Sequence, residues 1–172
     1  MIANPANTNA YILHHFSGGK VKKENITCLS RLDHNRAISQ IAKQTGAPVK
    51  DISGVVVFGN HSLTQYPSIQ TIKIAGKPAI DTVDKTWLET KFIESVQKRG
   101  GEVMDARKNS SVFSAANAVK DHLYDWYHGT DSYVSMGVYS EGDYDIPKGL
   151  WTSLPVVCKN FSYTVVKDVT VT

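Results

Sequence analysis

The sequence has little of what stabilises secreted proteins or anchors membrane proteins. Its two cysteines, Cys28 and Cys158, lie far apart without the spacing of a metal site, so we expect neither a disulfide framework nor a bound metal. No stretch approaches the roughly 18 apolar residues of a membrane span. The first residues lack a charged region followed by an apolar core. These absences predict an intracellular protein without a membrane contact.

Concentrated charge of one sign is scarce as well. The formal net charge is +3, and the densest basic cluster, Lys20 to Lys23, is explained better by a solvated loop than by nucleic-acid binding. With 41% hydrophobic and 20% charged residues, the composition is that of an ordinary globular protein. We therefore expect residues 1–172 to form a single domain with a real core and to bind no nucleic acid.

A glycine-rich phosphate-binding turn is also missing. None of the twelve glycines forms the turn that opens a dinucleotide-binding domain. The stretch from Gly54 to Gly59 has the spacing of a phosphate loop, but Asn60 and His61 follow it in place of Lys and Ser or Thr. We expect that an N-terminal dinucleotide-binding domain is absent from this chain.

Apolar residues at helical spacing predict four helices. They run from Asn4 to about His15, around Asp33 and Arg36 to near Gly46, from Asp84 to Gly100–Gly101, and from Val112 to His128. Asn4 is expected to cap the first helix, with Pro5 at its first position, and Asp84 to cap the third. The last helix carries an apolar stripe that we interpret as core: Val112, Ala116, Val119, Leu123 and Trp126.

Strands are predicted between and after the helices. Val55 to Phe58 is a continuous apolar run and indicates a strand that is buried on both faces. Shorter, exposed strands are expected near Thr71–Ile74 and after Gly76. Towards the end, period-two patterns predict strands at Tyr133–Ser140, Trp151–Cys158 and Phe161–Val166, the last two forming an antiparallel hairpin. Helices followed by antiparallel strands predict the α+β class, with helices packed on a largely antiparallel sheet.

Three side chains stand out as candidates for chemistry. Asp33 and Arg36 fall on one helix face inside the apolar stripe of Leu29, Leu32, Ala37 and Ile41, where unpaired charge is costly. His61 follows the buried strand, and a histidine near a partly buried carboxylate is a common acid/base arrangement. Simpler explanations stay open at this point. Asp33 and Arg36 suit an ordinary ion pair on a solvated face, and His61 suits a structural hydrogen bond.

Several segments, in chain order, closely resemble malate dehydrogenase of the cytosolic type, in the lactate/malate dehydrogenase family. The matching segments are Asn4–Asn9, Leu29–Ala37, Gly59–Ser62, Gln65–Pro67, Ala106–Ser111 and Val134–Val138. The resemblance implies the fold of that family's C-terminal domain, NAD as cofactor, malate and oxaloacetate as substrates, a homodimer and a cytoplasmic location.

The resemblance also implies a role for each site residue. His61 would accept the hydroxyl proton of malate and return it in the reverse direction, and Asp33 would orient its imidazole. Arg36 would bind the substrate carboxylate through its two-pronged guanidinium. Asn4 would lie near cofactor and substrate, and Ser111, or its neighbour Ser110, near the nicotinamide. For Asn4, helix capping is an equally good explanation, and for the serines a plain helix start is the favoured alternative.

The resemblance leaves three interpretations of the whole chain. The first is the substrate-binding and catalytic half of a malate dehydrogenase, with little or no turnover alone, because the family's cofactor domain and its two further carboxylate-binding arginines have no match here. The second is a non-catalytic module for dimerisation or assembly. The third is half of a dehydrogenase for another 2-hydroxy acid, such as lactate.

Overall fold

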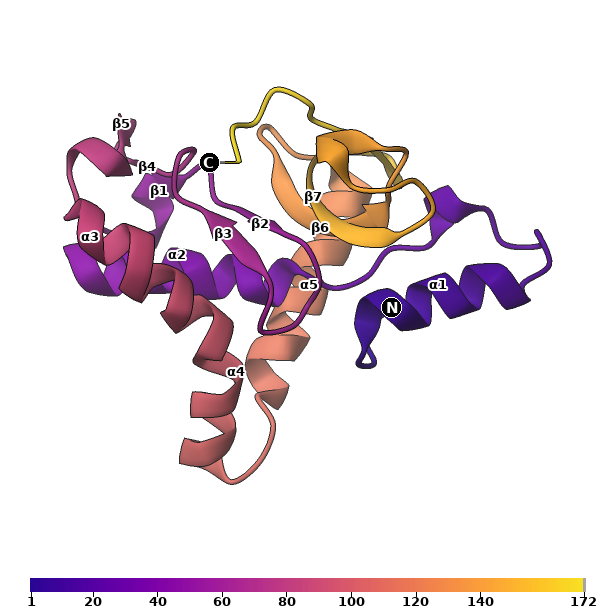
Figure 1. Ribbon diagram of the computed structural model, residues 1–172, viewed down its shortest axis with the longest axis horizontal. Coiled ribbons are helices and arrows are strands. Elements are labelled where there is room, and N and C mark those ends of the chain that lie inside the picture. Colours follow the sequence, from indigo (N-terminus) through magenta and orange to yellow (C-terminus); the bar gives the residue numbers. More distant parts are fainter. Residues whose placement is uncertain (172) are drawn as a thin grey trace.

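A computed structural model describes residues 1–171, in which five α-helices surround three small antiparallel sheets (Figure 1). The helices are α1 (Ala6–Phe16), α2 (Arg31–Thr45), α3 (Lys85–Trp87), α4 (Ile93–Arg107) and α5 (Val112–His128). The strands are β1 (Ile52–Ser53), β2 (Val56–Phe58), β3 (Tyr66–Ser68), β4 (Lys73–Ile74), β5 (Lys77–Pro78), β6 (Val134–Tyr139), β7 (Trp151–Lys159) and β8 (Ser162–Val165). Along these residues, no helix is both long and apolar enough to cross a membrane.

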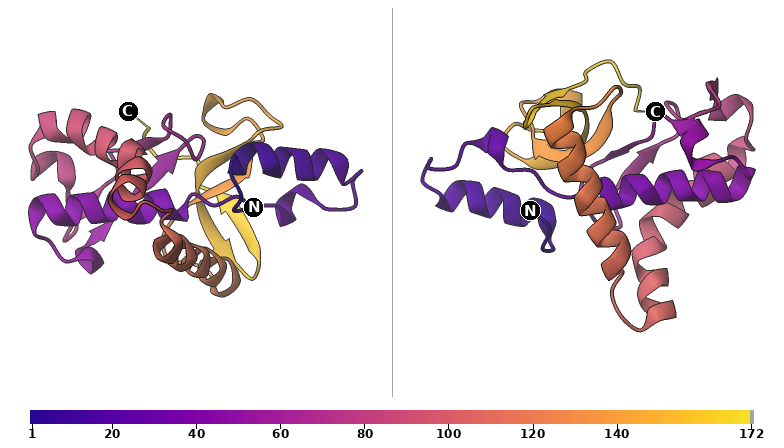
Figure 2. Two further views of the ribbon diagram at one scale, coloured as in Figure 1. Left: turned by 90° about the horizontal axis from the view of Figure 1, so that it is seen from below. Right: turned by 180° about the vertical axis from the view of Figure 1, so that it is seen from behind.

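All strand pairs are antiparallel, which confirms the predicted α+β class. The sheets are β6-β7-β8, β2-β3 and β1-β4-β5, and a bridge between Gly59 and Ser153 connects the end of β2 to β7. The predicted hairpin joins β7 to β8 through Asn160 and Phe161, whose positive φ angles of 49° and 58° suit a tight two-residue turn. Helices α4 and α5 project together from the body of the molecule (Figures 1 and 2).

Strand β2 lies between two hydrophobic clusters, as its apolar run predicted. Val55 and Val57 pack with Ile41 of α2 and with the helices that follow β5. Val56 and Phe58 point the other way, into the cluster under β6 and β7. Because side chains alternate along a strand, each face of β2 fills a different part of the core. The loop that follows β2 therefore starts from a fixed position.

The ends of two predicted helices were wrong. The N-cap position of α1 is Pro5, without a side-chain cap, so Asn4 lies outside the helix and does not cap it. The third predicted helix is capped by Asp84 as expected, but α4 continues past Gly100 and Gly101 as far as Arg107. Neither glycine has a positive φ. Because Gly100 has no side chain, it leaves room for the guanidinium of Arg36 on α2. A glycine inside a helix marks its end only if the chain turns left-handed there.

Only part of the predicted apolar stripe of α5 lies against the core: Val119 packs on the cluster with Leu29 and Leu32, and Trp126 packs on the cluster under β6 and β7. The buried residues of this helix are Ala118 and His122, whereas Val112 is 55% and Leu123 50% exposed. Asp125 of α5 also forms an ion pair with Arg31 of α2. The helix therefore presents only part of the predicted stripe, including Val112 and Leu123, to the outside.

We expect Gly137→Ala in β6 to destabilise the protein by about 2–3 kcal/mol. A Cβ at Gly137 would overlap the Cys28 sulfur and lie 2.6 Å from its carbonyl oxygen. Gly101→Ala is the control, because that position is open and helical, and the added methyl group should stabilise α4 by about 0.5–1 kcal/mol. Urea unfolding of both variants tests the pair. Equal effects would show that the contact between Cys28 and Gly137 is not tight.

Candidate active site

The His61 imidazole and the Asp33 carboxylate meet where the loop after β2 passes the first turns of α2. A hydrogen bond joins His61 Nδ1 to Asp33 Oδ2. The Asp33 side chain is 1% exposed and that of His61 is 18% exposed. With Nδ1 engaged by the carboxylate, Nε2 is the ring nitrogen left to exchange a proton with another molecule. A buried acceptor of this kind orients the ring and stabilises its protonated form.

Arg36 lies on the same face of α2, on the other side of Asp33. Its Nη1 is 3.5 Å from Asp33 Oδ1, and its Nη2 donates a hydrogen bond to Ser111 Oγ at 3.3 Å. The Arg36 side chain is only 12% exposed, so the pair does not lie on a solvated face and that alternative is wrong. Burial lowers the pKa of Arg36, while the charge of Asp33 acts to raise it.

A cavity of about 240 Å³ brings the other predicted residues together. His61 and Arg36 line it with Asn4, Ser110 and Ser111, and apolar residues of α2, α4, α5 and the segments before α1 and α2 complete the wall. Ser111 is at the N-cap position of α5, but its hydroxyl makes no capping hydrogen bond and accepts one from Arg36 instead. Four of the five predicted site residues therefore face one cavity, and Asp33 lies buried behind two of them.

Two further residues support the site and were not singled out from the sequence. Asn7 of α1 accepts a hydrogen bond from the His61 backbone N–H at 2.9 Å and donates one to the Trp151 carbonyl at 3.0 Å. His34 is buried on α2, and its Nδ1 lies 3.1 Å from Ser135 Oγ. Both join segments that are distant in the chain. Their only signal in the sequence was that Asn7 and His34 lie in the segments that resemble malate dehydrogenase.

Stability should fall below neutral pH because His34 is buried. Burial, with a smaller contribution from the charge of Arg31, lowers its pKa to about 3, and Asp121 opposes this. An unfolded histidine titrates near pH 6.5, so the unfolded state binds more protons between these values and stability is lost as pH falls through this window. From pH 7 to pH 5 we expect a loss of about 2 kcal/mol from His34. In urea unfolding at pH 7 and pH 5, His34→Gln should lose less stability than the unchanged protein, by about the 2 kcal/mol attributed to His34. An equal loss in both proteins would refute His34 as the cause.

The described residues hold no group of three or more His, Cys, Asp or Glu side chains suited to a metal ion. Cys28 and Cys158 are both free and buried, and burial raises the pKa of Cys28 to about 12 and that of Cys158 to about 11. Neither thiol is therefore a ready nucleophile at neutral pH. The chemistry that this geometry can perform is proton transfer by an oriented imidazole beside a guanidinium that can hold a carboxylate.

Fold and site together define an α+β domain in which an imidazole–carboxylate pair and a guanidinium lie at one small cavity. Residues 30–171 match the lactate/malate dehydrogenase, alpha/beta C-terminal domain. The chain is 52% identical to a probable malate dehydrogenase 3 of Dictyostelium discoideum, over 97% of this chain and 52% of that protein. It is 48% identical to the cytoplasmic malate dehydrogenase 3 of Arabidopsis thaliana, over 99% of this chain and 52% of that protein. The chain belongs to the lactate/malate dehydrogenase family.

Solved structures agree with this assignment. A malate dehydrogenase of Naegleria fowleri matches with a TM-score of 0.92 and 40% identity, over 99% of this chain and 53% of that one. A lactate dehydrogenase of Trichomonas vaginalis, in complex with NADH and oxamate, matches with a TM-score of 0.93 and 29% identity. This match covers 99% of this chain and 54% of that one. The chain thus spans about half the length of the relatives that it matches.

Proposed function

We propose that this chain is the substrate-binding and catalytic half of an NAD-dependent malate dehydrogenase that interconverts malate and oxaloacetate in the cytoplasm. One observation carries the proposal: the hydrogen-bonded pair of His61 and Asp33 opens, together with Arg36, on a single cavity. The relatives named cytoplasmic malate dehydrogenase support the choice of substrate and location.

In this proposal the protein's own groups bind the substrate and move its proton. Arg36 holds a substrate carboxylate with two parallel hydrogen bonds, and its contacts with Asp33 and Ser111 fix the plane of the guanidinium. His61 Nε2 accepts the hydroxyl proton of malate as the C–O bond becomes a carbonyl, and it returns that proton in the reverse reaction. Asp33 stabilises the imidazolium that forms in between.

The cavity fits the reactive end of a nicotinamide cofactor. Asn4 and Ser111 supply polar groups at its edge, close to His61 and Arg36, and we propose that they contact that end. When bound there, NAD would supply the acceptor for the hydride of the malate carbinol carbon. The glycine-rich turn that would hold the rest of the cofactor has no counterpart in this sequence. We therefore propose that the chain alone has little or no turnover.

Substrate choice between malate and lactate is the finer part of the proposal. The cavity offers one arginine for one carboxylate, and a lactate dehydrogenase is among the structural neighbours. The test compares NADH oxidation with oxaloacetate and with pyruvate, after mixing the chain with a separately produced dinucleotide-binding half of a malate dehydrogenase relative. We expect oxaloacetate to be strongly preferred. Preference for pyruvate would refute malate as the substrate.

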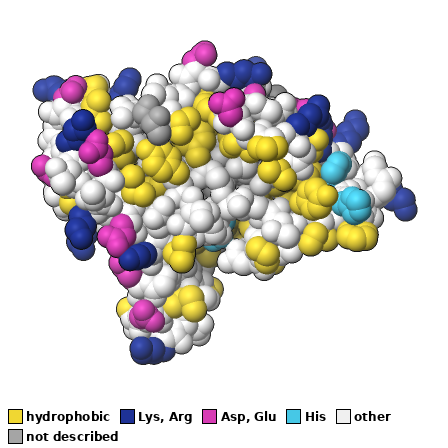
Figure 3. All heavy atoms as spheres, viewed as in Figure 1, with side chains coloured by type: hydrophobic (Ala, Val, Ile, Leu, Met, Phe, Trp, Pro, Cys, Tyr) yellow, Lys and Arg dark blue, Asp and Glu magenta, His cyan; other side chains and the backbone are white. Residues whose placement is uncertain are grey.

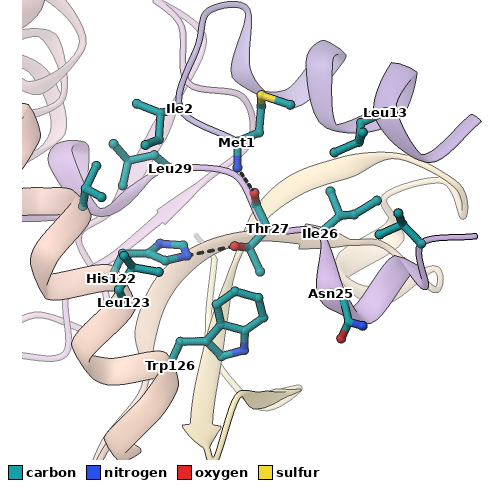
Figure 4. A pocket seen from close by; sticks show the side chains of 12 residues that line it. Met1, Ile2, Leu13, Asn25, Ile26, Thr27, Leu29, His122, Leu123 and Trp126 are labelled. Atoms are coloured by element: carbon teal, nitrogen blue, oxygen red, sulfur yellow. Dashed lines mark hydrogen bonds between the residues drawn. The ribbon is translucent and has the colours of Figure 1, made fainter. Parts of the chain in front are cut away.

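A specific observation supports a second role, in assembly with another subunit of the same family. Large apolar side chains are exposed on α1 and α5, among them Phe16, Phe113 and Tyr124. Figure 3 shows hydrophobic side chains gathered over α1 and over the strands beside it. A cavity of about 240 Å³ is lined by Leu13 of α1, by Leu123 of α5 and by residues of the segment from Asn25 to Leu29 that lies between them (Figure 4). Exposed apolar surface of this extent is typical of an interface.

Light scattering coupled to size-exclusion chromatography tests the assembly role. We expect a homodimer that forms as the protein concentration rises, and we expect Leu123→Asp on α5 to weaken it. Gln44→Asp, at an exposed position of α2, adds the same charge away from the apolar surface and serves as the control. A chain that stays monomeric at all concentrations would count against self-association.

A further inference from the structure

Arg36 also borders a second cavity, on the outer side of α2. This outer cavity has a volume of about 390 Å³ and lies between α2, α4 and α5. Three cationic side chains line it, Arg36, Lys43 and Arg99, and none of its described lining residues is acidic. The volume is more than ten times the roughly 30 Å³ that a water molecule occupies in the liquid. It is large enough for a small organic ligand.

Several uncharged polar side chains of the outer cavity already have hydrogen-bond partners. Ser39 Oγ donates to the Asn35 carbonyl at 2.8 Å, and Ser114 Oγ donates to the Ser111 carbonyl at 3.2 Å. Asn117 Nδ2 donates to an Asp121 carboxylate oxygen at 2.9 Å. The donors left for a ligand are therefore those of the cationic side chains and the amide of Gln40. A ligand that matches them must be rich in acceptors and negatively charged.

The charges around the outer cavity are incompletely balanced. Arg99 has one partner, Glu102, with 2.9 Å between Arg99 Nη1 and Glu102 Oε2, on the exposed surface of α4. No ion pair connects Lys43 to another residue in the described part of the chain. The charge of Arg99 also contributes, after burial, to the lowered pKa of Arg36. An anion between the two guanidinium groups would relieve this repulsion.

We propose that the outer cavity binds a small multivalent oxyanion, a polycarboxylate or a phosphate, between Arg36, Arg99 and Lys43. Ser114 lies in the first turn of the 17-residue helix α5, so the positive end of that helix also points to this region. Binding at this cavity does not depend on the proposed function. One consequence does rest on the proposed function. An anion in the outer cavity and a substrate carboxylate beside His61 would compete for Arg36.

Titration of the chain with citrate and with inorganic phosphate at constant ionic strength, followed by NMR, tests the proposal. We expect saturable shifts at the amides of Ser39, Arg99 and Ser114, and acetate, with a single charge, should bind more weakly. The double variant Lys43→Gln/Arg99→Gln should lower the affinity about tenfold or more. Lys20→Gln, at an exposed position near α1, removes one charge far from the cavity and should change the affinity less than about twofold.

Three results would overturn the proposal. Shifts that do not saturate and spread over the whole basic surface would mean non-specific screening. Shifts confined to Asn4, His61 and Ser110 would place the anion in the cavity that His61 lines. An affinity that the double variant leaves unchanged, with its fold confirmed by thermal unfolding, would exclude Lys43 and Arg99 as ligands. Because the readout is binding to the chain alone, a failed dehydrogenase assay would not affect it.

Discussion

Replacing His61 with Asn is expected to lower kcat for oxaloacetate about 10³-fold or more in the assembled enzyme. The amide of the substituted side chain can still donate a hydrogen bond to the buried carboxylate of Asp33, but it cannot exchange a proton near neutral pH. The proton-transfer step should therefore be lost, while the pair that joins α2 to the loop after β2 is kept. Steady-state kinetics with NADH and oxaloacetate measure the effect.

His128→Asn is the matched control for this prediction. His128 is exposed at the end of α5 and has no place in the cavity, so the same chemical change there should leave kcat close to that of the unchanged protein. Thermal unfolding of both variants separates a catalytic effect from a folding effect. If His61→Asn folds normally and keeps kcat within about tenfold, another group accepts the proton and the role of His61 is refuted.

Arg36→Lys should lower kcat/KM about 10²-fold, mainly by raising KM. A lysine keeps the positive charge beside Asp33, but it offers a single point of contact where the guanidinium offers two parallel donors. It also loses the hydrogen bond to Ser111, which helps to fix the plane of Arg36. The expected pattern differs from that of His61→Asn, because substrate binding suffers more than proton transfer.

Arg107→Lys is the control for Arg36→Lys. Arg107 is exposed at the end of α4, beside the ring of Phe113, and does not line the cavity. Its replacement should leave KM for oxaloacetate unchanged. An unchanged KM in Arg36→Lys as well would mean that the substrate carboxylate is bound elsewhere.

Local patterns were sufficient to predict the elements that position the site. The apolar run of β2 and the left-handed Gly46 at the end of α2 are features of neighbouring residues, and both predictions were confirmed. The predicted end of α4 was wrong and the predicted core face of α5 was only partly right, because both depend on contacts between segments. Gly100 continues the helix next to Arg36, and Asp125 of α5 forms an ion pair with Arg31 of α2.

The site shows the same division between local and distant signals. Helical spacing was enough to place Asp33 and Arg36 on one buried face. The contact of His61 with Asp33 joins residues 28 positions apart and was implied by the family resemblance, not by spacing. Asn7 could not be found in this way, because its partners are a backbone N–H in one loop and a carbonyl of β7. A polar contact with a distant backbone atom leaves no periodic signal in the sequence.

NADH oxidation with oxaloacetate is the most direct test of the proposed function. It is measured for the purified chain alone and again after mixing with a separately produced dinucleotide-binding half of a relative. We expect turnover only in the mixture, because the proposed proton acceptor and the proposed carboxylate ligand lie in this chain while a glycine-rich turn for NAD does not. Robust turnover by the chain alone, or no turnover in a mixture of two demonstrably folded parts, would contradict the proposal.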